Sequence, residues 1–153
     1  MHTDTFKAIE KLIQANNHAD AEKLIQSSAT DSETLNNIGI LYYNRENNEY
    51  AERYFLQSID LNNDYQTAIH NLAELYYNSG KILDASQYYE RYIILNPNDT
   101  NTINQLALIY TKIGEIRKSR DMLKKSLEIN PEQDETKTIL GDLEKLLSQT
   151  ITE

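Results

Sequence analysis

The residues that interrupt helices occur at one fixed spacing along this chain. Among 153 residues there are only four glycines and two prolines, whereas average usage predicts roughly nineteen. All six obey a spacing of 34 residues or a multiple of it. The pairs that show this are Gly80 with Gly114, Pro97 with Pro131 and, at three times 34, Gly39 with Gly141. A constant period of this size indicates stacked structural repeats.

Three blocks align without gaps at this period, at residues 32–65, 66–99 and 100–133. The first half of each block carries apolar residues at block positions 4, 7 and 11, which is the spacing of one helical face. The second half has a small residue at position 20 and a large one at position 24. Glycine at position 15 suits a left-handed helix end, and proline follows the second helix, where no amide donor is needed. Each block is therefore predicted to form two helices.

Small residues mark the predicted crossing of the two helices in each block. In the first block these are Gly39, at position 8, and Ala51, at position 20. Helices approach closely only where side chains are small. We therefore expect an all-α protein in which Gly39 faces Ala51.

The blocks resemble the tetratricopeptide repeat. Their first halves read LNNIGILYYN, IHNLAELYYN and INQLALIYTK. In each, Leu or Ile precedes a Gly or Ala, and a Tyr follows three residues later, as in the family. Glu46 and Asn63 depart from the Gly and Pro that the family has at those positions. The resemblance implies an α-solenoid of tandem antiparallel helix pairs in a right-handed superhelix.

The two ends of the chain depart from the repeat. Residues 1–31 contain two apolar stripes and are predicted to form a degenerate helix pair whose second helix is about one turn short. Residues 134–149 continue the first-helix pattern and are predicted to form a capping helix, which an open solenoid needs over its last apolar face. Residues 150–153 are expected to be a frayed tail. The whole chain, 1–153, is predicted to be one domain.

Composition excludes several classes of function. The absence of cysteine rules out disulfides, thiolate metal sites and cysteine nucleophiles. The net charge of −9 argues against nucleic-acid binding, which needs clustered Lys and Arg. The sequence has no apolar run long enough to span a membrane and no signal-peptide core at its start, so we expect a cytoplasmic protein. No phosphate loop or metal-ligand spacing is present, and we expect no catalytic site, metal or cofactor.

The resemblance also implies where a ligand would bind. In the family, the first helices line a concave groove, and a set of recurring positions contacts the ligand. Carried over residue by residue, the peptide-binding groove here consists of Asn36, Asn37, Ile40, Tyr43, Asn44, His70, Asn71, Glu74, Tyr77, Asn78, Asn104, Gln105, Leu108 and Lys112. Members that bind the C-terminal tail of a chaperone hold its carboxylate with Lys and Arg. Because Lys112 is the only cation in this set, a chaperone tail is not the expected partner.

Two features of this set indicate peptide binding. Asn37, Asn71 and Gln105 share block position 6 and resemble the asparagine ladder with which O-GlcNAc transferase binds a peptide backbone. An amide offers both a donor and an acceptor to a peptide unit. Tyr43 and Tyr77 could anchor apolar side chains of a ligand. Each feature also has a structural interpretation, as a consequence of the chain's richness in Asn or as partly covered packing.

Three hypotheses of function follow. The first is an interaction scaffold that binds a peptide or protein, neutral or basic given the acidic chain, in the groove. The second is a self-assembling structural protein whose N-terminal helices dock into a neighbouring protomer to form a homo-oligomer. The third is an accessory domain of a larger bacterial transferase.

Overall fold

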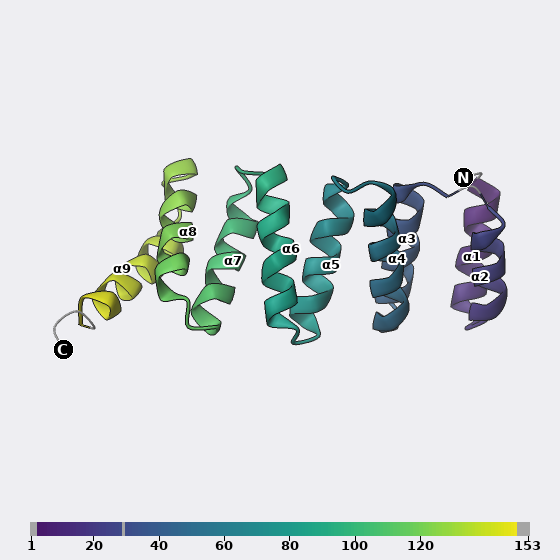
Figure 1. Cartoon of the computed structure of the whole chain (residues 1–153), viewed down its shortest axis with the longest axis horizontal. Helices are drawn as coiled ribbons and strands as arrows, with labels where there is room; N and C mark the ends of the chain where they lie inside the picture. Colours follow the sequence, from purple (N-terminus) through teal and green to yellow (C-terminus); the bar gives the residue numbers. More distant parts are fainter. Residues whose placement is uncertain (1–2, 29, 150–153) are drawn as a thin grey trace. The chain divides into compact units, whose positions relative to one another are not determined.

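The computed structural model describes residues 3–28 and 30–149, and within them it consists of nine α-helices without strands (Figure 1). The all-α prediction is thus confirmed. The helices are α1 (Thr3–Gln14), α2 (His18–Gln26), α3 (Ser32–Tyr43), α4 (Asn48–Leu61), α5 (Gln66–Asn78), α6 (Ile82–Leu95), α7 (Thr100–Lys112), α8 (Ile116–Ile129) and α9 (Asp134–Gln149). The predicted tail 150–153 lies outside the described residues.

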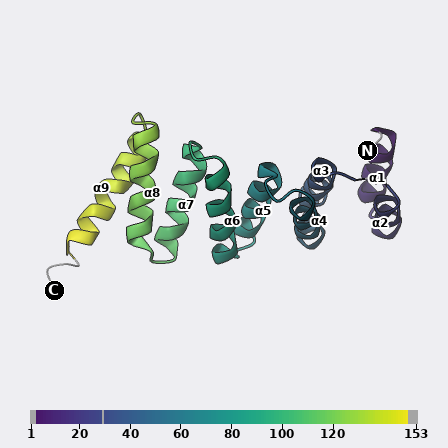
Figure 2. The same ribbon diagram turned by 45° about the horizontal axis from the view of Figure 1, so that its top comes forward.

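The helices form two compact units, an N-terminal unit of residues 1–79 and a C-terminal unit of residues 80–153. In the N-terminal unit, α1 packs on α2 and α3, and α5 packs on α3 and α4. In the C-terminal unit, α7 packs on α6 and α8, and α9 packs on α8; successive helices run up and down (Figure 2). The division falls inside the second block, so the block boundaries and the single domain remain predictions.

The predicted helical faces form the core of each unit. In the N-terminal unit the residues at block positions 4, 7 and 11 are all buried: Leu35, Ile38 and Tyr42 in α3, and Ile69, Leu72 and Tyr76 in α5. In the C-terminal unit Ile103, Leu106 and Tyr110 of α7 are buried in the same way. Ala107 packs in one apolar cluster with Leu123 of α8 and Leu143 of α9. Because Leu143 belongs to this cluster, α9 covers apolar side chains of α7 and α8.

Gly39 is required by close packing of α3 on α4. A Cβ atom at this position would lie 2.6 Å from two ring carbons of Phe55. The nearest atoms belong to the large side chain at position 24, so the ring of Phe55 fills the space beside this glycine, as expected of a large residue next to a crossing of small ones.

The first helix of each pair ends in a left-handed residue. Gly80 and Gly114 have φ of 76° and 81°, as predicted, and Asn16 and Glu46 adopt φ of 57° and 59° at the corresponding places. The amide of the following residue then bonds a carbonyl five residues back, as Asn47 does to Tyr42, which is the Schellman arrangement. The left-handed residues are 34 apart in the regular blocks but only 30 apart between Asn16 and Glu46. Accordingly, α2 has nine residues where α4 has fourteen.

Candidate peptide-binding face

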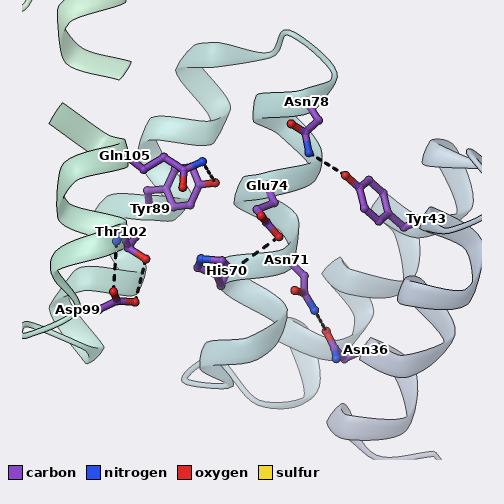
Figure 3. A network of polar contacts seen from close by, with 10 residues as sticks. All are labelled: Asn36, Tyr43, His70, Asn71, Glu74, Asn78, Tyr89, Asp99, Thr102 and Gln105. Atoms are coloured by element: carbon purple, nitrogen blue, oxygen red, sulfur yellow. Dashed lines mark hydrogen bonds and ion pairs between the residues drawn. The ribbon is translucent and has the colours of Figure 1, made fainter. Parts of the chain in front are cut away.

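In the N-terminal unit, α3 and α5 lie side by side and present equivalent positions to one another. We call the side chains at these positions the α3–α5 face; Figure 3 labels Asn36, Tyr43, His70, Asn71, Glu74 and Asn78 among them. Its members are Asn36, Asn37, Ile40, Tyr43, Asn44, His70, Asn71, Glu74, Tyr77 and Asn78. Steps of three and four residues place the members within each helix on adjacent rows.

Two asparagines at neighbouring positions are joined across the two helices. The side-chain amide of Asn71 donates a hydrogen bond of 2.8 Å to the side-chain oxygen of Asn36 (Figure 3). Asn36 is only 1% exposed. Asn36 therefore supports Asn71 from beneath, and its burial takes it out of the set that a ligand could touch.

A second bond joins the helices nearer their C-terminal ends. The amide of Asn78 donates to the hydroxyl oxygen of Tyr43 at 2.7 Å (Figure 3). Tyr43 is half-buried and Asn78 is exposed. The bond fixes the orientation of the Tyr43 ring, which would otherwise rotate at the surface.

The charged group of the face is Glu74. Its carboxylate lies 4.0 Å from Nδ1 of His70, one turn earlier on α5, and the glutamate side chain is 46% exposed. At the same face, Asn37 and Ile40 are half-buried and Asn44 is exposed. The amide of Asn37 makes no hydrogen bond to another described residue. The described part of the face thus offers a carboxylate, amides and a phenol, and contains no Lys or Arg.

The C-terminal unit holds the remaining predicted residues on α7. Gln105 donates a hydrogen bond of 2.8 Å to the hydroxyl of Tyr89 on α6 (Figure 3). Asn104 instead reaches the start of α9, donating to Gln133 at 2.7 Å and to Thr136 at 3.1 Å. Leu108, 45% exposed, and Lys112 both reach solvent. Asn104 therefore ties α7 to the start of α9.

Partners on the second helices were not found by sequence reasoning. The hydroxyl of Tyr76 donates to the carboxylate of Glu52, and that of Tyr110 donates to Glu90. Burial raises the pKa of Tyr110, and the bond to Glu90 raises it further. Each glutamate lies on the second helix of the block before its tyrosine, but at a different block position, 21 for Glu52 and 25 for Glu90. No fixed register therefore pointed to either of them.

Within residues 3–28 and 30–149, His, Asp and Glu side chains do not gather in groups of three or more that could hold a metal ion. Across the same residues, no helix has the length and apolar character needed to cross a membrane.

Comparison of the sequence with protein families gives three matches. Models described as tetratricopeptide repeat match residues 32–63, 67–99 and 101–133. Together these matches cover more than half of the chain. Among curated proteins, no sequence match was found.

Comparison with solved structures finds the same fold at low sequence identity. The first tetratricopeptide-repeat domain of Spaghetti (RPAP3), bound to the HSP90 peptide SRMEEVD, is 16% identical with a TM-score of 0.65, over 79% of this chain and 96% of that one. YrrB, described as having an unusual peptide-binding site, is 16% identical with a TM-score of 0.66, over 88% and 72%. MamA AMB-1 is 16% identical with a TM-score of 0.74, over 94% and 81%.

Proposed function

This chain belongs to the tetratricopeptide-repeat family, and on that basis we propose that it is a protein-interaction scaffold whose α3–α5 face binds an extended peptide segment of a partner. Two of the similar structures, those of RPAP3 and YrrB, are described as binding peptides. The observation that carries the proposal is the pair of hydrogen bonds that fix this face in the free protein, from Asn71 to Asn36 and from Asn78 to Tyr43.

The bond to Asn36 prepares Asn71 for a peptide unit without exhausting it. A side-chain amide has two N–H donors and a carbonyl acceptor. One donor of Asn71 is used on Asn36, which sets the plane of the amide and leaves the carbonyl and the second donor for a ligand. Asn37, one position further along α3, has its whole amide available. These two residues would bind backbone groups and so tolerate different ligand side chains.

A fixed face lowers the cost of binding. Immobilising a side chain at an interface costs about 0.5–1.5 kcal/mol. Because Tyr43 is already held by Asn78, most of that cost for the ring is met in the free protein. Tyrosine combines a large contact area with few rotatable bonds, which makes it a frequent anchor in interfaces. Tyr43 would therefore pack against an apolar side chain of the peptide.

Charge narrows the class of partner. The chain carries a net charge of −9, and the α3–α5 face contains Glu74 without Lys or Arg. A peptide that presents a carboxylate here would meet no cation to pair with it and would be repelled by Glu74. We therefore propose a neutral or basic peptide.

The proposal is tested by selecting binders from a random peptide library displayed on phage, with the full chain as bait. Selected peptides are then synthesised and titrated by fluorescence polarisation. The double variant Asn37→Ala/Asn71→Ala should weaken binding by about tenfold, since two hydrogen bonds contribute roughly 0.5–1.5 kcal/mol each. The sequences selected should be diverse, because backbone groups carry the contact.

The matched control is Gln14→Ala/Asn62→Ala, which removes two exposed amides of the N-terminal unit, one at the end of α1 and one at the end of α4, outside the α3–α5 face. Its affinity for the same peptides should equal that of the wild type. The proposal is wrong if no peptide is enriched, or if the two double variants bind equally well.

A further inference from the structure

The short second helix of the N-terminal pair leaves a cavity that the regular repeats do not predict. Because α2 stops at Gln26, after nine residues, the last turn of α4 is open on the side of α2. A shallow cavity of about 350 Å³, open to solvent over much of its extent, lies there within the N-terminal unit. Small-ligand sites begin at roughly 300 Å³, so the space is large enough for one long side chain. It lies apart from the α3–α5 face and does not depend on the function proposed for that face.

The walls of this cavity combine an apolar floor with one carboxylate. Ile25 and Leu35 are 5% and 4% exposed, and Leu61 is 59% exposed at the mouth. Asp60 is the charged residue among those that line it, and no basic residue lines it. Asp60 makes no hydrogen bond or ion pair with another described residue, so its carboxylate faces solvent uncompensated.

Helix geometry adds to the negative potential. The cavity is lined by residues at the C-terminal ends of both α2 and α4, where the helix dipole places partial negative charge. No basic residue occupies the last turn of α4. Lys23, in the last turn of α2, pairs with Asp20 at 3.2 Å and does not line the cavity. A cation that entered the cavity would therefore be attracted by two helix ends and by Asp60.

We propose that this cavity binds the side chain of a lysine or arginine from a protein partner. The aliphatic part of such a side chain would lie on Ile25, Leu35 and Leu61, and its charge would meet Asp60. Long cationic side chains bury their stems on apolar surface while keeping the head group in a polar environment. An anionic side chain would be repelled, and a purely apolar one would gain nothing from Asp60.

The test is a titration of the full chain, labelled with ¹⁵N, with Nα-acetyl-lysine N-methylamide, followed by two-dimensional NMR. The norleucine analogue, which has the same stem without the cation, is the comparison ligand. The lysine probe should shift the amides of Gln26, Ser28, Asp60 and Leu61 in a saturable way. The norleucine probe should bind about three- to fivefold more weakly, the range expected when a partly exposed ion pair is lost.

Two variants of α4 make the test specific. Asp60→Asn should abolish the preference for lysine over norleucine. Glu49→Gln removes the same charge from the opposite end of the helix, where the residue is also exposed, and should keep the preference. The proposal is overturned if the cavity amides do not shift, if norleucine binds as tightly as lysine, or if the two variants behave alike. Shifts confined to α3 and α5 would overturn it too.

Discussion

The side-chain amide of Asn71 on α5 donates to the side-chain oxygen of Asn36 on α3, a residue 35 positions earlier in the sequence. Asn36 is 1% exposed, so its oxygen has this amide in place of water. The loss of this bond should therefore affect both the stability of the fold and the orientation of Asn71 on the α3–α5 face.

Replacing Asn36 by Ala should lower the free energy of unfolding by about 1–2 kcal/mol, because a buried hydrogen bond is lost and a cavity is left. Asn37→Ala, one residue later, where the side chain is half-buried and its amide makes no hydrogen bond to another described residue, should change it by no more than about 0.5 kcal/mol. Urea denaturation followed by circular dichroism measures both. Equal effects would show that the bond to Asn71 does not form in solution.

Three tyrosines at block position 11 should respond differently to the loss of their hydroxyl groups. Tyr76 and Tyr110, 7% and 6% exposed, donate to Glu52 and Glu90. Changing either to Phe should destabilise the chain by about 1.5–3 kcal/mol, the range for a hydrogen bond to a charged group.

The third of these tyrosines, Tyr42, is fully buried, and its hydroxyl has no hydrogen-bond partner among the described residues. Its ring is stacked on those of Tyr50 and Tyr54. Tyr42→Phe keeps this stacking and removes an unsatisfied polar atom, so it should be neutral or stabilise the chain by up to about 1 kcal/mol. Thermal unfolding compares all three variants. If Tyr42→Phe were less stable than the wild type, the hydroxyl of Tyr42 would not be buried without a hydrogen-bond partner.

Replacing glycine by alanine should have opposite effects on the stability of the fold at two helical sites. Gly39→Ala places a Cβ atom 2.6 Å from the ring of Phe55, and such overpacking costs about 1–3 kcal/mol. Gly141, in α9, would meet no atom within 4 Å. Gly141→Ala should therefore stabilise the chain by about 0.5–1 kcal/mol through helix propensity alone. Denaturation midpoints with unchanged slopes would establish both values, and the same sign for the two would contradict this packing.

Asp99 is the N-cap residue of α7, and it should make the stability of the fold depend on pH in the acid range. Burial tends to raise the pKa of Asp99, but hydrogen bonds from the backbone and hydroxyl of Thr102, from Tyr92 and from the backbone of Asn101 outweigh it and lower the pKa below 3.8. A depressed pKa in the folded state means that the charged form stabilises the fold at pH values above about 3.8. This contribution is lost as the pH falls through the folded-state value.

Asp99→Asn should consequently be less stable than the wild type at pH 7, and the difference should shrink as the pH falls below about 4. Denaturation of the two proteins side by side between pH 7 and pH 2.5 measures this. A difference that stays constant over that range would show that the charge of Asp99 contributes nothing.

Much of the helical framework follows from local sequence. The 34-residue spacing of the breakers predicted the left-handed ends at Gly80 and Gly114, and the 3–4 periodicity predicted the buried faces of α3, α5 and α7. These features depend on the conformation of single residues and on the geometry of one helix. The close contact of Gly39 with the ring of Phe55 was not specified by this pattern, because it depends on the position of a side chain on another helix.

The candidate site was less predictable from the sequence, because its contacts join residues on different helices. The sequence placed Asn37, Asn71 and Gln105 at one repeat position, but it could not tell that Asn71 bonds Asn36 while Gln105 bonds Tyr89. Likewise, the short α2 was visible in the sequence, whereas the cavity beside Asp60 was not. The sequence by itself determined the helices, their ends and their apolar faces, since these are set within a few residues. Only the tertiary structure decided which polar groups meet, because hydrogen bonds and cavities depend on distances of a few ångströms between side chains from different helices.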